Sequence, residues 1–213
     1  MKNLRRIATT AAIFRRTPEW RYASPMEWAL ITVLVGLAAG VGWLFNRLVG
    51  LRNRAVNAWA DIDVQLKQRH VLVGSLVEVV RGYARHERQT LESVVEARAR
   101  AEGARGTGAP DAAGRAEGEL GGSIRGLFAL VEAYPELKAS EQFLTLHRSL
   151  VDVEDKIQNA RRYYNAVVRD LNTRIQSFPD LLVSRLFRFA ERKYFELDSA
   201  DERAAPRVDL EPR

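Results

Sequence analysis

The chain has 213 residues, with 33 lysines and arginines against 27 aspartates and glutamates, and a formal net charge of +6 at pH 7. It contains no cysteine, which excludes disulfides, thiol catalysis and zinc sites built on cysteine. Most of the excess charge precedes Trp28, and beyond it acidic and basic residues are interspersed and nearly balanced, which argues against nucleic-acid binding.

An uncharged apolar run, WALITVLVGLAAGVGWLF, extends from Trp28 to Phe45. A helix needs about 20 apolar residues to cross a bilayer core, so we predict one transmembrane helix over residues 26–46, preceded by a basic tail over residues 1–25. A tryptophan near each end of the run suits the headgroup region. A buried core helix would show polar periodicity, and a signal peptide would have a shorter apolar region, so both alternatives are disfavoured.

Gly36 and Gly40 form a G-x-x-x-G pair within this run. Small residues at this spacing let two membrane helices approach closely, so the pair is a candidate site for helix pairing. Glycine is also common in membrane helices, and that is the simpler interpretation.

The chain after the span is predicted to be helical. Residues 26–109 lack proline, and apolar residues recur every three or four positions, which predicts one very long helix from Asn46 to Arg100. Glycines between residues 103 and 118 predict a flexible connection. A second helix is expected over Glu119–Ala133, where Tyr134 and Pro135 end it.

A third helix is expected to begin after Ser140, which can cap it, and to end at Pro179. Its apolar residues form a heptad seam typical of a coiled coil. Leu181–Phe189 is predicted to form a short amphipathic helix, which either caps the bundle or lies on the membrane surface, and capping is the simpler reading. We therefore predict an all-α fold, with an antiparallel bundle of long helices over residues 47–197 and a flexible polar tail over residues 198–213.

Polar residues on the predicted helices suggest one candidate cluster. A polar layer between helices could be formed by Asp61, Asp63, Asn165 and Asn172. Such a layer would bind a ligand or partner, or would set the register of the helices through hydrogen bonds. The simpler alternative is that these residues only face solvent. His70 and His86 are too far apart on one helix to share a metal ion. No catalytic, cofactor-binding or metal-binding residues are predicted.

Three stretches resemble the LemA family of bacterial membrane proteins. They are IDVQLKQRHVLVGSLVEVVRGYARHERQTLESVVEARA at Ile62–Ala99, LFALVEAYPELKASEQFLTLHRSLVDVEDKIQNARRYYNAVVRDLNTRIQSFP at Leu127–Pro179 and KYFELDSADERAAPRVDL at Lys193–Leu210. The resemblance implies one membrane helix in the bacterial cell (inner) membrane and an antiparallel helical bundle on the cytoplasmic side. Two departures are Gly74, where proline is usual, and the long N-terminus, which leaves Met1 and Met26 as alternative starts.

The function that these features favour is a membrane-anchored helical-bundle interaction or scaffold protein, which contacts the lipid bilayer and unidentified protein partners. The alternatives are a structural membrane organiser that forms homo-oligomers and an accessory factor to membrane proteolysis, which only the resemblance suggests. An enzyme is the least favoured class, because a thin bundle seldom provides a concave site. No nucleic acid, cofactor or metal is expected.

Overall fold

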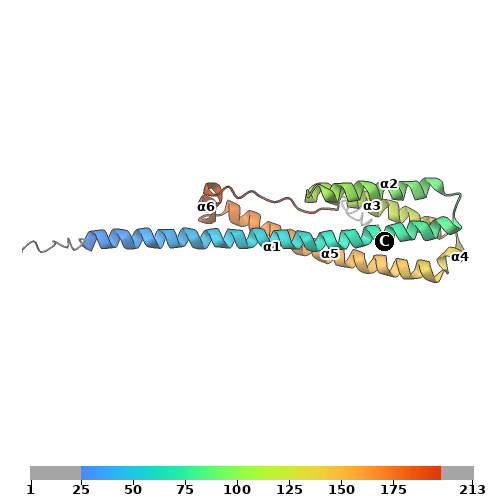
Figure 1. Ribbon diagram of the computed structural model, residues 1–213, viewed down its shortest axis with the longest axis horizontal. Coiled ribbons are helices and arrows are strands. Elements are labelled where there is room, and N and C mark those ends of the chain that lie inside the picture. The colour runs from blue at the N-terminus through green and yellow to red at the C-terminus, as the bar shows by residue number, and fades with distance from the viewer. Residues whose placement is uncertain (1–24, 198–213) are drawn as a thin grey trace, which may run out of the picture. The chain divides into compact units, whose positions relative to one another are not determined.

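The computed structural model describes residues 25–197, and this part of the chain is helical and contains no β-strand (Figure 1). The helices are α1 (Pro25–Tyr83), α2 (Arg88–Gly106), α3 (Pro110–Val131), α4 (Pro135–Lys138), α5 (Glu141–Gln176) and α6 (Asp180–Leu186). The predicted all-α fold is confirmed. The predicted tails, apart from Pro25 at the end of the first, lie outside the described residues.

The chain divides into two compact units, residues 1–43 and residues 44–213, so the boundary falls within α1. The described part of the first unit is the apolar stretch, which is long and apolar enough to cross a membrane. Its mean hydropathy is 2.0 and none of it is buried, so large side chains such as Leu30, Val33 and Leu37 are exposed along it.

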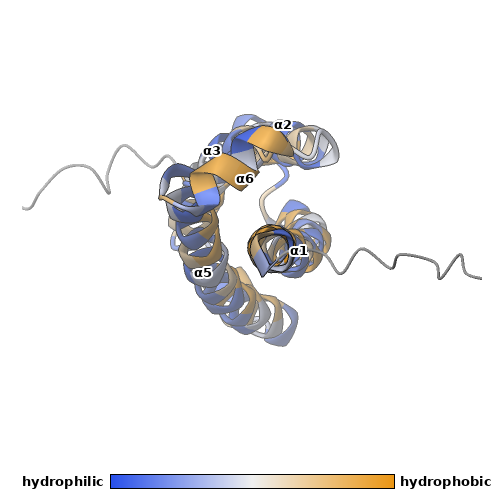
Figure 2. Cartoon of the chain, turned by 90° about the vertical axis from the view of Figure 1, so that its left-hand side faces the viewer, coloured by the Kyte–Doolittle hydropathy of each residue, from blue (hydrophilic) through white to orange (hydrophobic). Residues whose placement is uncertain are grey.

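The second unit is the helical bundle, in which α1, α5 and the α2–α3 pair surround a common interior (Figure 2). One face of α1 is buried from Leu48 to Val80, as its apolar spacing predicts. On α5 the heptad seam is buried at the following positions: Phe143, Leu150, Val153, Ile157, Tyr164, Val167 and Leu171. The expected third helix is thus confirmed, and it begins after Ser140, although that side chain makes no capping hydrogen bond within residues 25–197.

The prediction of one helix from Asn46 to Arg100 is wrong, because α1 ends at Tyr83 and the chain reverses before α2 begins at Arg88. Gly82 weakens the last turn, since glycine is a poor helix former. The reversal brings Val94 and Ala97 of α2 into the same buried core as the end of α1. An apolar face that continues through a turn has the same spacing as one uninterrupted helix, so the periodicity did not reveal the turn.

The prediction of a flexible glycine-rich connection is also wrong. Residues 103–106 complete α2 and α3 begins at Pro110, a favoured first helical residue, so only residues 107–109 connect the two helices. Gly114 within α3 has a steric role, because a Cβ added there would lie 2.1 Å from the backbone oxygen of Glu196. Glycine is required at this position to let the C-terminal segment cross the helix closely.

Candidate functional site

The C-terminal part of the described chain is an extended segment over residues 190–197, called the strap here. Asn172 donates a hydrogen bond from Nδ2 to the Arg192 carbonyl oxygen and accepts one from the Arg192 N–H, both at 2.9 Å. Asn165 makes the same pair of bonds with the backbone of Phe195, both at 3.0 Å. The two asparagines are seven residues apart on a helix, and their partners Arg192 and Phe195 are three residues apart in an extended segment. Both separations correspond to about 10 Å, so each asparagine lies beside its partner.

The strap is also held by aromatic packing between α1 and α5. Phe195 is fully buried, and its ring centroid lies 5.6 Å from that of Trp59 on α1. Tyr164 on α5 packs against the same tryptophan at 5.7 Å and donates a hydrogen bond to the Lys193 carbonyl oxygen at 2.9 Å. Burial raises the pKa of the Tyr164 phenol above its ordinary value of 10.0, and the nearby Arg192 opposes this shift. The strap therefore contacts both α1 and α5.

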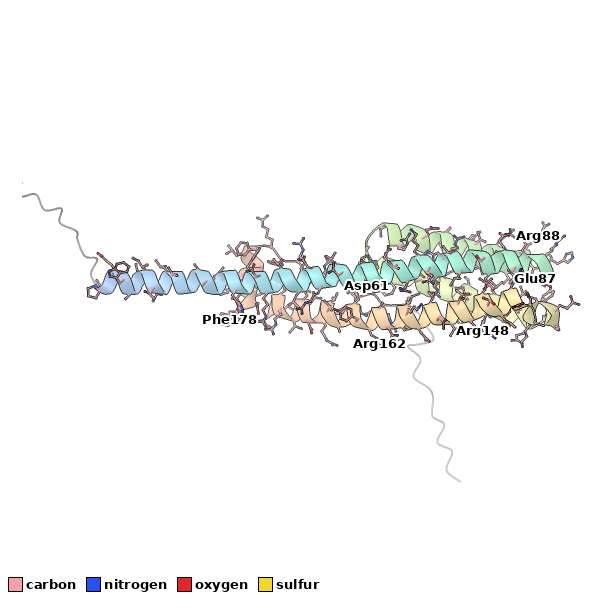
Figure 3. The ribbon with its side chains drawn as sticks, turned by 60° about the horizontal axis from the view of Figure 1, so that its bottom comes forward. Asp61, Glu87, Arg88, Arg148, Arg162 and Phe178 are labelled. Carbon is pink, nitrogen blue, oxygen red and sulfur yellow. The ribbon has the colours of Figure 1, made fainter. Side chains whose placement is uncertain are left out.

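The structure does not bring the four predicted polar residues together among the residues it describes. Asn165 and Asn172 bind the strap backbone, whereas Asp63 pairs with Arg105 of α2 at 2.8 Å. Asp61 is exposed on α1 (Figure 3). The spacing of polar residues on a helix indicates a polar partner, but it does not indicate that this partner is an extended backbone.

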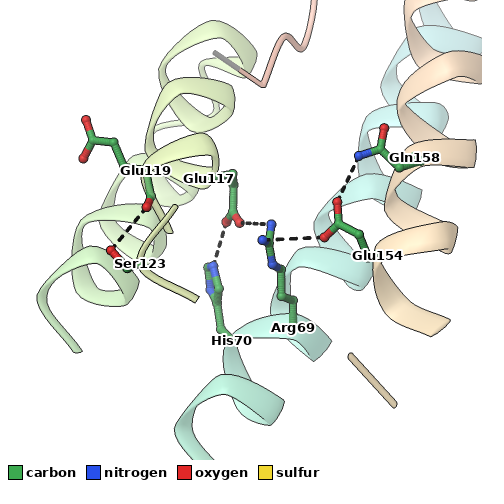
Figure 4. Close-up of polar contacts among 7 residues, drawn as sticks. All are labelled: Arg69, His70, Glu117, Glu119, Ser123, Glu154 and Gln158. Carbon is green, nitrogen blue, oxygen red and sulfur yellow. Dashed lines mark hydrogen bonds and ion pairs between the residues drawn. The ribbon is translucent and has the colours of Figure 1, made fainter. Parts of the chain in front are cut away.

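A second polar feature, the ionic cluster, comprises Arg69 and His70 of α1, Glu117 of α3 and Glu154 of α5 (Figure 4). The His70 Nε2 atom lies 2.6 Å from one Glu117 carboxylate oxygen, and Arg69 Nη1 lies 3.2 Å from the other. The Nη2 atom of Arg69 lies 3.5 Å from the Glu154 carboxylate. Glu117, Arg69 and His70 are buried, so each depends on the others to offset the cost of leaving water.

A hollow of about 290 Å³ lies beside the ionic cluster. Its lining includes the polar residues Arg69 and Glu154 and the apolar residues Ile124, Phe128 and Leu150. Leu197, at the end of the strap, also lines it. The hollow can accept a small group with one polar end, and within residues 25–197 no group of three or more histidines, aspartates or glutamates is placed to hold a metal ion.

The ionic cluster is not predicted from the sequence, in which His70 is weighed only as a metal ligand. One signal was present, because Glu117 follows Ala113 and precedes Leu120 and Ile124 at the spacing of an apolar helix face. A carboxylate at a core position of such a face requires a buried partner. The pattern predicts that a partner exists but not that it comes from α1.

The two glycines predicted to pair membrane helices lie on the open surface of α1. A Cβ added at Gly36 or Gly40 would meet no atom within 4 Å among the described residues. The four-residue spacing places both on the same side of the helix, so this side can be approached closely.

Comparison with known proteins places the chain in a sequence context. The family model described as the LemA family matches residues 58–210. The chain is 23% identical over 210 residues to magnetosome protein MamQ of Magnetospirillum gryphiswaldense, covering 86% of this chain and 77% of the relative. It is 26% identical over 170 residues to protein LemA of Metamycoplasma hominis, covering 74% of this chain and 75% of the relative.

Proposed function

Since the chain belongs to the LemA family, we propose that it is a membrane-anchored helical-bundle protein that acts by binding other proteins, as an interaction module or scaffold without a catalytic role. Residues 26–46 cross the bilayer once, and the bundle presents its surface to partners. The proposed membrane is the bacterial cell (inner) membrane.

The observation that carries the anchor is the exposure of the apolar stretch. Its side chains have no protein core to enter in the first unit, since none of the candidate span is buried. Exposing so many apolar side chains to water is unfavourable, and the hydrocarbon of a bilayer removes that cost. Trp28 and Trp43 are exposed near the two ends of the run, where indole rings suit the headgroup region.

The interaction role is supported by an apolar row on the outer surface of α1. Val56, Val64 and Val71 are all exposed, and Val64 retains 60% of its accessible surface. Their spacing is close to two helical turns, so they lie along one side of the helix. These valines lie outside the bundle core and offer an apolar strip for a partner to cover.

Photo-crosslinking tests the interaction role. A photoreactive residue at Val64, in the full chain expressed in its own membrane, is expected to give an adduct with a different protein. The same residue at Glu78, whose side chain is 69% exposed on the same helix, serves as the matched control. Equal adduct yields at both positions would contradict the proposed strip, and so would the absence of an adduct at Val64.

A second candidate function, self-assembly as a structural organiser, is favoured by the open surface at Gly36 and Gly40. It predicts that the Val64 adduct has twice the mass of the chain and disappears in a Gly36→Ile variant. If the adduct keeps its yield in the Gly36→Ile variant, the result supports the interaction module and contradicts the organiser.

We further propose that the bundle lies on the cytoplasmic side. The basic tail over residues 1–25 favours the opposite orientation, but Arg47 is the basic residue closest to the apolar run and is followed by Arg52 and Arg54, and basic residues beside a span are retained in the cytoplasm. We expect a C-terminal tag to resist protease in intact spheroplasts and to be cleaved after lysis. Cleavage before lysis would place the bundle outside the membrane.

A further inference from the structure

The hook, defined as residues 178–189 around α6, has one buried face and one exposed apolar face. Val183 and Ser184 are buried, and the Ser184 hydroxyl donates to the Ile175 carbonyl oxygen at 3.0 Å, which fixes α6 on the end of α5. The outer side chains are large and apolar, since Phe178, Leu182 and Leu186 retain 79%, 61% and 71% of their accessible surface. Figure 3 labels Phe178. Adjacent exposed apolar side chains of this size mark a contact surface.

The hook lies next to the residue at which the apolar run ends. The ring centroid of Phe45 is 4.7 Å from that of Phe187 and 5.7 Å from that of Phe189. All three residues belong to the second unit, so their arrangement is independent of how the two units are oriented. If residues 26–46 cross the bilayer, Phe45 enters the boundary between acyl chains and headgroups, and the hook is held at the same level.

Positive charge surrounds this end of the bundle. Two surface hollows beside residues 45–54 are lined by Arg47, Arg52, Arg54, Arg169, Arg174, Arg188 and Arg192, with Asp170 and Glu191 as their acidic residues. The buried Asp180 lies 3.9 Å from Arg47 and 3.6 Å from Arg174, which offsets part of the charge. Arginines remain in clear excess, and such an excess beside an apolar face matches the anionic surface of a bilayer.

We propose that the hook is a second membrane contact: its outer face inserts into the interfacial layer, and the arginines around it bind anionic phospholipid headgroups. This inference rests on the proposed anchor, because the anchor delivers the hook to the bilayer. A lipid surface is the occupant that fits, since the hook packs against Phe45, the last residue of the apolar run, and its rim carries the positive charge that anionic headgroups attract. A bundle held at two points is restrained in its tilt, which orients the surface that partners meet.

Lipid-quenching fluorescence tests the proposal on the full chain, whose lack of cysteine allows single labels. The variants Leu182→Cys, Val35→Cys and Val151→Cys carry an environment-sensitive fluorophore in the hook, the span and the exposed side of α5. They are reconstituted in vesicles of phosphatidylcholine and phosphatidylglycerol that contain spin-labelled lipid. We expect the Leu182 probe to shift to the blue relative to detergent and to lose most of its emission to a shallow quencher. The Val35 probe should respond to a deep quencher, and the Val151 probe to neither.

The outcomes separate the two proposals. Quenching at Val35 without quenching at Leu182 overturns the hook and leaves the anchor intact, whereas no quenching at Val35 overturns both. The charge contribution is tested by the Arg52→Gln/Arg188→Gln double variant, which should reduce quenching at Leu182 in vesicles with phosphatidylglycerol. Arg162→Gln, on the exposed surface of α5, is the matched control. Quenching that is the same with and without phosphatidylglycerol overturns headgroup binding.

Discussion

Glu117→Ala is expected to lower the free energy of unfolding by about 3–5 kcal/mol, because it leaves Arg69 buried beside a methyl group and removes the partner of His70. Glu154 cannot compensate, since it is partly exposed and lies 3.5 Å from the other guanidinium nitrogen. For a bundle of this size the loss corresponds to a decrease in Tm of roughly 6–20 °C. Thermal and urea unfolding of the full chain in detergent, followed by circular dichroism, measures it.

Glu119→Ala is the matched control for this prediction. Glu119 lies two positions further along α3, its side chain is 60% exposed and it pairs with Arg100 on the surface, so its removal should cost about 0–1 kcal/mol. Replacing Arg69, His70 and Glu117 together by Met, Leu and Leu should restore much of the stability, because no charge is then left buried. Equal effects of the two glutamate variants would contradict a structural role for the ionic cluster.

Phe195→Ala is expected to cost about 3–5 kcal/mol, since it removes a fully buried ring that joins Trp59 to the strap. The loosened strap should also be cut more quickly by trypsin at Arg192 and Lys193. Tyr194→Ala is the control on the neighbouring residue, whose side chain is exposed, and should change neither the unfolding midpoint nor the cleavage rate appreciably. A strap that is cleaved equally fast in both variants would show that Phe195 does not hold it.

A pair of glycine variants tests the strap from the other side. Gly114→Ala places a methyl group 2.1 Å from the Glu196 backbone oxygen, so the strap must move and the bundle should lose about 1–3 kcal/mol. Gly126→Ala, on the same helix, meets no atom within 4 Å among the described residues and should stabilise the bundle by about 0.5–1 kcal/mol. Effects of the same sign would indicate that the strap does not pass closely over α3.

Elements whose evidence is local can be identified from the amino-acid sequence without knowledge of the fold. The uncharged run from Trp28 to Phe45 identifies the candidate span, because the width of a bilayer sets the length of helix that crosses it. The heptad seam identifies α5, with its start after Ser140 and its end before Pro179, because helical periodicity and proline geometry act over a few residues.

Which segment covers each apolar face becomes known only from the folded bundle. Contacts between distant residues determine three features of the bundle. These are the turn after Tyr83, the helical state of the glycine-rich segment and the pairing of Asn165 with an extended backbone. The requirement for glycine at position 114 comes from Glu196, and the burial of Glu117 is made possible by Arg69 and His70. In both cases the partners are distant in the sequence. Periodicity indicates that a helix face is apolar or that a carboxylate interrupts this face. The segment that packs on the face, and the residue that pairs with the carboxylate, are selected by the packing of the whole bundle.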